Sequence, residues 1–338
     1  SDFPYDWDYI NIKEQLNILR FLKIWYTDNV VKISWLVKNR KAYEPLMNEK
    51  VLNTLEFHKI TSILADYAGS EPGRQMCTKL RPSSNPEWIS HAQEETSAAL
   101  SRLFKNDRIS FGANKDIRAL IKSMEIGRTA NASELLSIGR LLTCTAELVR
   151  YGEKEHDDDP DDALTEYFSS LSPLPLLEKE ISRCILSEEE IADDASPTLK
   201  NIRRQIAVTG DKIHTQLSSM VTGAYRTYLQ DAVITMRDNR YCIPVKAEYK
   251  GQVSGMIHDQ SSSGSTFFIE PAAIVNLNNQ LKELALKEQE EIEVILATLS
   301  AMAGEHTEEL MSNYKLMTKL DFIFAKAKLA LDQNATRP

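Results

Sequence analysis

Residues 234–271 read ITMRDNRYCIPVKAEYKGQVSGMIHDQSSSGSTFFIEP, and this stretch decides the fold. Alternating and β-branched side chains flank Asp238-Asn239, a pair that suits a tight turn between two strands. Two further short strands are predicted within GQVSGMIHD and STFFIEP, separated by a Ser-Ser-Ser-Gly turn. The pattern therefore predicts a small antiparallel sheet in a chain that is otherwise patterned for helices.

A long amphipathic helix is predicted on each side of this sheet. Before it, apolar residues recur at intervals of 3, 4 and 7 at Leu199, Ile202, Ile206, Ile213, Leu217 and Met220. After it, a second apolar stripe is formed by Ile274, Leu277, Leu281, Leu284, Ile292, Ile295, Leu299 and Met302. As a helix, this second stripe would span about 43 Å. Two helices with one apolar stripe each can bury those stripes as an antiparallel coiled coil.

The predicted fold class is mainly α, with a multi-helix core and a long antiparallel helical lever that carries a small antiparallel β-sheet clamp. The predicted boundaries are a helical core over 47–197 and 303–338, lever helices over 198–232 and 271–302, and the sheet over 233–270. Residues 1–46 contain three of the four tryptophans and form an extension whose origin stays open. It is either a foreign upstream piece or an accessory helical segment.

Composition limits the class of protein. The 338 residues are 42% hydrophobic and 26% charged, which is typical of a globular or extended helical protein. The four cysteines form no CxxC pair, so we expect reduced thiols rather than a metal site or a disulfide framework. No apolar run approaches the roughly 18 residues of a membrane span, and no signal peptide is recognisable. These features predict a cytoplasmic protein without membrane partners.

No constellation in the chain predicts catalysis, a metal site or a cofactor of its own. The acidic run at 156–162 is interpreted as a solvated loop, although clustered aspartates could bind a cation. His258, Asp259 and Ser261 are the residue types of a nucleophilic triad, but neighbours on a strand point to opposite faces. The glycine-containing stretch at 69–74 lacks the Lys-Ser/Thr pair of a phosphate-binding loop.

Basic residues are concentrated in and before the predicted sheet. Between Thr198 and Lys250, nine basic residues accompany four acidic ones, so this segment is net +5 in a chain of net charge −9. A projecting sheet that bears Arg237, Arg240, Lys246 and Lys250 is predicted to bind phosphates with salt-dependent, sequence-independent affinity. The alternative is that these charges only solubilise the sheet or guard its edges. The lever would then be a coiled-coil module that docks a protein and binds no nucleic acid.

Three stretches resemble the bacterial MutS paralogues that lack the mismatch-reading domain and carry a C-terminal Smr nuclease domain. They are LNTLEFHKI at 52–60, the quoted stretch at 234–271, and LDFIFAKAKLA at 320–330, and the resemblance covers roughly residue 47 onward. It implies that the helical pair is the lever and the sheet the clamp. It also implies an ATPase domain and a nuclease domain in the longer protein, so ATP and Mg²⁺ are expected there and this chain itself is not expected to be an enzyme.

The same resemblance implies what the longer protein does. It would bind branched or mismatched DNA and restrain recombination, or act on stalled ribosomes with ribosomal RNA as the ligand. The full-length protein would be a homodimer, whereas this chain alone is expected to be monomeric or weakly associated. The sequence leaves open which nucleic acid is preferred and which clamp residues contact phosphate.

Overall fold

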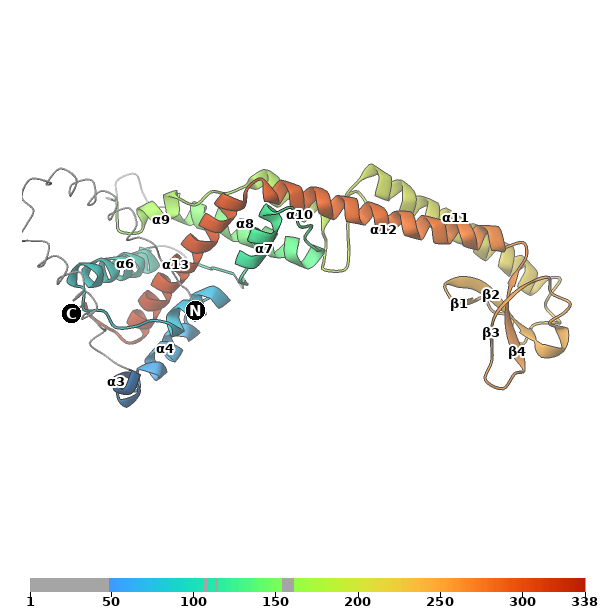
Figure 1. Cartoon of the computed structure of the whole chain (residues 1–338), viewed down its shortest axis with the longest axis horizontal. Coiled ribbons are helices and arrows are strands. Elements are labelled where there is room, and N and C mark those ends of the chain that lie inside the picture. Colours follow the sequence, from blue (N-terminus) through green and yellow to red (C-terminus); the bar gives the residue numbers. More distant parts are fainter. Residues whose placement is uncertain (1–48, 106–108, 113–114, 154–160, 338) are drawn as a thin grey trace, which may run out of the picture. The chain divides into compact units, whose positions relative to one another are not determined.

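The computed structural model describes residues 49–105, 109–112, 115–153 and 161–337 (Figure 1). The described residues fall into two compact units, one that contains residues 49–60 and 80–90 and the other that contains residues 61–79 and the described part of the chain from residue 91 onward. The predicted extension at 1–46 and most of the acidic run at 156–162 lie outside the described residues. The core, the lever and the sheet discussed below belong to the second unit.

Helices dominate the described residues, and the mainly α fold with one small sheet is confirmed. The helices before the lever are α3 Glu49–Thr54, α4 Phe57–Asp66, α5 Glu71–Thr78, α6 Pro86–Lys105, α7 Arg118–Glu125, α8 Ala132–Glu153, α9 Thr165–Ser169 and α10 Pro175–Cys184. The two helices predicted as the lever correspond to α11 Pro197–Thr222 and α12 Val275–Gly304, called the lever helices below, and α13 Thr307–Asp332 follows. None of the described helices is long and apolar enough to cross a lipid bilayer.

The helical core is built around α8 and α13. Aromatic rings fill its centre, where the ring of Phe324 on α13 lies 5.7 Å from that of Phe111 and 6.1 Å from that of Tyr151. Asp321, also on α13, is fully buried and accepts hydrogen bonds from the backbone N–H groups of Gly69 and Ser70 at 2.9 and 2.8 Å. The carboxylate thereby satisfies donors at the start of α5 that would otherwise be unpaired inside the protein.

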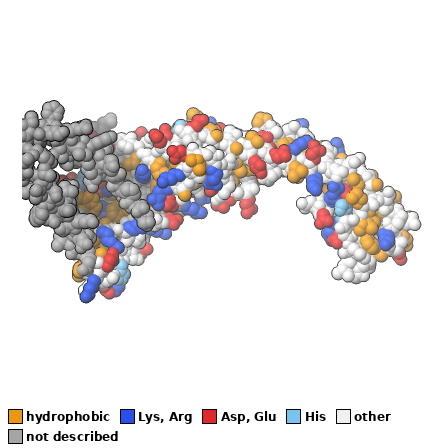
Figure 2. All heavy atoms as spheres, viewed as in Figure 1, with side chains coloured by type: hydrophobic (Ala, Val, Ile, Leu, Met, Phe, Trp, Pro, Cys, Tyr) orange, Lys and Arg blue, Asp and Glu red, His pale blue; other side chains and the backbone are white. Residues whose placement is uncertain are grey.

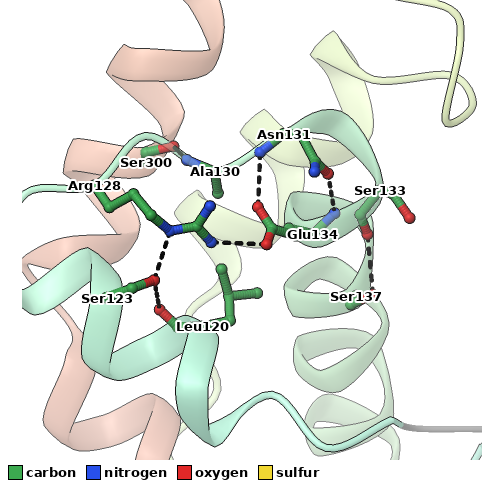
Figure 3. A network of polar contacts seen from close by, with 9 residues as sticks. All are labelled: Leu120, Ser123, Arg128, Ala130, Asn131, Ser133, Glu134, Ser137 and Ser300. Carbon is green, nitrogen blue, oxygen red and sulfur yellow. Dashed lines mark hydrogen bonds and ion pairs between the residues drawn. The ribbon is translucent and has the colours of Figure 1, made fainter.

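A polar network joins the C-terminal end of α12 to the start of α8 (Figure 3). Asn131 and Glu134 cap α8 reciprocally, since each side chain accepts a hydrogen bond from the backbone N–H of the other, at 2.9 and 3.0 Å. Arg128 donates to Glu134 at 2.7 Å. The backbone N–H of Ala130 donates to Ser300 Oγ on α12 at 2.9 Å. One end of α12 is therefore held against the core.

The lever helices α11 and α12 lie side by side, as the two apolar stripes predict (Figure 1). At the α-helical rise, the 30 residues of α12 span about 45 Å. Two polar contacts cross the pair, from Arg203 Nε to Glu288 and from Ser196 Oγ to Glu291, each at 2.7 Å. The two helices thus form one paired element.

Both lever helices are shorter at the sheet end than the sequence predicts. The first ends at Thr222, ten residues before the expected limit of 232. The helix stops at Gly223, its C-cap, whose ψ of −114° is not helical, and beyond the turns that follow, Leu229 forms an antiparallel bridge with Val245. The second begins at Val275 rather than at residue 271, since Pro271 is the last residue of a strand.

The sheet has four antiparallel strands in the order β1-β2-β4-β3, with bounds β1 Thr235–Arg237, β2 Arg240–Lys246, β3 Gly255–Gln260 and β4 Thr266–Pro271. Asp238 and Asn239 have φ of 49° and 58°, the left-handed conformation of a two-residue hairpin turn, so the predicted turn is confirmed. A short 3-10 helix, η2 Ala247–Tyr249, follows β2. The β3–β4 pairing contains a bulge between Ile257 and Asp259.

One face of the sheet is buried against the lever. Alternate residues of β2 and β4, including Ile243, Val245 and Ile269, pack in one hydrophobic cluster with Ile213 and Leu217 of α11. Because successive strand residues point to opposite faces, the residues between them point away from this cluster. The charged residues of β2 and β4 therefore lie on the other face or at the strand ends.

Candidate nucleic-acid interface

A buried carboxylate links the sheet to the start of α12. Glu270 on β4 is 0% exposed, and its Oε1 accepts hydrogen bonds from Arg240 Nη1 at 2.7 Å and from Asn278 Nδ2 at 2.8 Å. Its Oε2 lies 2.6 Å from His258 Nε2. Burial by itself raises the pKa of Glu270, but the hydrogen bonds from Asn278, His258 and Arg240 outweigh it and lower the pKa below its ordinary value. Glu270 is consequently an ionised anchor at neutral pH.

Arg240 forms an ion pair with Glu270. Its side chain is only 20% exposed, and its Nη2 donates to Asn279 Oδ1 at 2.6 Å in addition to the bond with Glu270. The guanidinium therefore links β2, β4 and the first turns of α12. With its charge balanced by a buried carboxylate, Arg240 is placed to hold the sheet on the lever rather than to attract an external anion.

Arg237 also forms an ion pair, but a more exposed one than that of Arg240. Its Nε lies 3.0 Å from Asp259 Oδ2, and its guanidinium carbon lies 3.8 Å from the centre of the Phe268 ring. Both charged side chains are more than one third exposed, and ion pairs of this kind contribute only about 0–1 kcal/mol. A phosphate could therefore replace Asp259 as the partner of Arg237 at little cost.

Lys246 and Lys250 differ from both arginines. Neither lysine forms an ion pair with a carboxylate in the part of the chain that the structure describes. Instead, Lys246 Nζ lies 6.0 Å from the centre of the Tyr249 ring, and Lys250 Nζ lies 5.0 Å from that of Phe267. The four predicted binding residues thus divide into two lysines without a charge partner and two arginines with one.

The two lysines are accompanied by tyrosines that sequence reasoning missed. The ring centres of Tyr225 and Tyr228 are 6.3 Å apart, and those of Tyr228 and Tyr249 are 5.1 Å apart. The backbone N–H of Lys246 donates to the carbonyl of Tyr228 at 2.9 Å, which brings the two segments together. We call Tyr225, Tyr228, Lys246, Tyr249 and Lys250 the tyrosine–lysine corner. The available signal was the interleaving of aromatic and basic residues in YRTY and KAEYK.

Apolar and basic side chains are mixed on the surface of the sheet region. Figure 2 shows hydrophobic side chains over the strands beside those of Lys and Arg. On the edge strand β3, Met256 and Ile257 are each 52% exposed. The surface is therefore not uniformly basic, and the positions of the unpaired cations decide where an anion can bind.

Other candidate sites do not assemble in the described residues. No group of three or more His, Cys, Asp or Glu side chains there could hold a metal ion. His258 contacts Glu270, and Asp259 pairs with Arg237, so these residues do not form the relay of a nucleophilic triad. In the stretch at 69–74, Ser70 caps α5 and its backbone N–H donates to the carboxylate of Asp321. The negative charge of that carboxylate would repel a phosphate.

Comparison with known proteins identifies close relatives. Over 293 residues, or 86% of its length, the chain is 50% identical to the protein named Endonuclease MutS2 of Agathobacter rectalis and 48% identical to that of Lachnospira eligens. It is 41% identical over 294 residues to the one of Acetivibrio thermocellus. The chain spans 37% of the length of each of these relatives. No protein-family model matches the chain.

Proposed function

Because the chain belongs to the MutS2 family of MutS paralogues, we propose that it is the nucleic-acid-gripping part of such a protein. In this proposal α11 and α12 are the lever and the four-stranded sheet is the clamp. The clamp binds the phosphate backbone of DNA without reading its sequence. Ribosomal RNA on a stalled ribosome presents the same phosphate chemistry and is the second proposed ligand.

The observation that carries this proposal is the pair of lysines in the tyrosine–lysine corner. Lys246 and Lys250 lie at one end of the sheet without a carboxylate partner among the described residues, so binding a phosphate breaks no ion pair. Each phosphate that a cation neutralises releases condensed counterions, which favours association at low salt. Arg237 adds a third contact by exchanging Asp259 for phosphate, whereas Arg240 holds the sheet in place.

The lever supplies the connection between the clamp and the core. Asn278, near the start of α12, bonds to Glu270, and Ser300, near its end, bonds to the core. A movement of the core at Ser300 would therefore be passed along one continuous helix to the sheet. For the longer protein we propose the properties that the resemblance implies: homodimerisation, an ATPase that uses ATP and Mg²⁺ to move the levers, and a nuclease, with a role in limiting recombination or rescuing ribosomes.

The test is a salt titration of binding to labelled duplex DNA, followed by fluorescence anisotropy. For the double variant Lys246→Glu/Lys250→Glu, we expect weaker binding and a slope of log K against log salt that is smaller by about 2, since two phosphate contacts are lost. The matched control is Lys200→Glu/Arg204→Glu, two exposed cations near the start of α11. Co-sedimentation with ribosomes under the same salt series tests the second ligand.

Two outcomes count against the proposal. An unchanged slope in the Lys246→Glu/Lys250→Glu variant would remove the corner from the interface. Absence of binding to both DNA and ribosomes at low salt would favour the alternative that the sheet docks a protein.

A further inference from the structure

The tyrosine–lysine corner contains more aromatic surface than phosphate binding requires. Tyr225, Tyr228 and Tyr249 pack against the hydrophobic cluster of the sheet, yet none of them is buried. The planes of neighbouring rings are inclined by 37° and 31°. Rings inclined in this way leave part of each face uncovered by the next ring. The corner therefore offers partly open π surfaces at one end of the sheet.

These rings lie beside Lys246 and Lys250, which have no charge partner in the part of the chain that the structure describes. Lys246 and Lys250 flank the short helix η2 that carries Tyr249, and Lys250 also lies over Phe267. Proteins that bind single strands combine the same two components, a basic path for the backbone and aromatic rings on which successive bases stack. In a continuous duplex the bases are stacked on one another, so their faces cannot reach such rings. The combination favours unpaired nucleotides.

Phe268, the residue that follows Phe267 on β4, provides a contrast. Its ring is covered by the guanidinium of Arg237 at 3.8 Å, and Arg237 is itself paired with Asp259. That ring is not open to a base, and its cation already has a partner. The tyrosine–lysine corner differs from this site, because it combines partly open rings with two lysines that have no charge partner among the described residues.

We propose that this corner stacks unpaired bases, so that the chain prefers nucleic acid with single-stranded nucleotides over continuous duplex. The inference rests on the proposed function and names the substrate class of the same site. Lys246 and Lys250 bind the phosphates that flank the unpaired nucleotides, while Tyr228 and Tyr249 contact the faces of the bases. Gapped or bulged DNA, branch points and exposed RNA loops share this chemistry.

The experiment compares affinities for two DNA molecules of equal length, a continuous duplex and a duplex with a short single-stranded gap. The gap carries 2-aminopurine, whose fluorescence falls when the base stacks. For the unmodified chain we expect binding to gapped DNA that is tighter by about 5- to 10-fold, the lower part of the range for one stacked base because the rings are partly covered. We also expect quenching of 2-aminopurine.

Ring removal and ring retention separate stacking from packing. Tyr228→Leu/Tyr249→Leu keeps apolar side chains but removes the rings, and it should reduce the preference for gapped DNA to about 1-fold. Tyr228→Phe/Tyr249→Phe keeps the rings and should retain both the preference and the quenching. Tyr249 lies in η2 outside the strands, so Tyr249→Leu alone decides the question if the double leucine variant does not fold.

The possible failures are distinguishable. Equal affinity for gapped and continuous DNA, or a preference that survives ring removal, overturns the stacking inference. If binding to the duplex still depends on salt, the proposed phosphate binding is unaffected by that result. Absence of binding to either DNA at low salt overturns the proposed function and the inference together.

Discussion

Replacing Glu270 by glutamine tests whether one buried charge holds the sheet on the lever. The Glu270 side chain is fully buried and contacts Arg240, Asn278 and His258 within 2.8 Å. Glutamine has the same shape, and its oxygen can still accept from Arg240 and Asn278 while its amide can donate to His258 Nε2 in the tautomer that leaves this nitrogen without a proton. The substitution therefore removes the negative charge and preserves the number of hydrogen bonds.

The expected magnitude follows from that difference. A hydrogen bond to a charged group contributes about 1.5–3 kcal/mol, against about 0.5–1.5 kcal/mol between neutral groups. Arg240 keeps some contact with water, so we expect Glu270→Gln to lower the free energy of unfolding of the sheet by about 1–2 kcal/mol. Glu270→Ala, which leaves the buried donors without an acceptor, should cost about 3–5 kcal/mol.

The pH dependence has a definite sign. The folded-state pKa of Glu270 is lowered from the ordinary value of 4.5, so the unfolded chain binds a proton at this carboxylate more readily. The stability that Glu270 contributes is complete above about pH 4.5 and is lost as the pH falls through the lower folded-state pKa. Glu270→Gln should remove this part of the acid dependence.

The assay is hydrogen exchange of the backbone amides of β2, read by mass spectrometry at neutral pH and again below pH 4.5. The matched control is Glu248→Gln, an equal loss of charge at an exposed position in η2. Equal protection of β2 in the unmodified chain and in Glu270→Gln at both pH values would refute the view that an ionised Glu270 anchors the sheet.

Two further predictions concern the core and the division of the basic residues. Gly73→Ala should lower the free energy of unfolding by about 1–3 kcal/mol in thermal denaturation, because the added Cβ would lie 2.1 Å from an Asp321 oxygen; the control Gly210→Ala, in open space within α11, should raise it by about 0.5–1 kcal/mol, and equal effects would contradict the clash. Arg240→Gln should reduce β2 protection in hydrogen exchange and leave the salt slope of DNA binding unchanged, since its charge is balanced by Glu270; a smaller slope would place Arg240 among the phosphate contacts.

Local patterns in the sequence predicted the elements of the lever and the clamp. The turn at Asp238-Asn239 depends on two residues that tolerate positive φ, and both adopt it. The apolar stripe of α12 could be predicted because Leu284, Ile295 and Leu299, which are buried, recur at helical spacing. Such features depend on residues within a few positions of one another, so a single sequence contains enough information to predict them.

The candidate site depended on contacts that the sequence pattern does not reveal. In the sequence, each of the four predicted binding residues is simply one positive charge: Arg237, Arg240, Lys246 and Lys250. Which of them is available to bind a phosphate depends on the partner of each side chain. Arg240 finds Glu270 across 30 residues, through the register of β2 with β4. Neither residue type nor spacing indicates that this arginine is neutralised and the two lysines are not.

The same distinction explains the tyrosine–lysine corner. The bridge between Leu229 and Val245 places Tyr228 beside Lys246. The sequence by itself determined the helices, the strands and the excess of basic residues, because periodicity and turn chemistry act over short distances along the chain. Only the tertiary structure decided which cations are free and which rings lie beside them, because burial and charge pairing depend on residues that folding brings together.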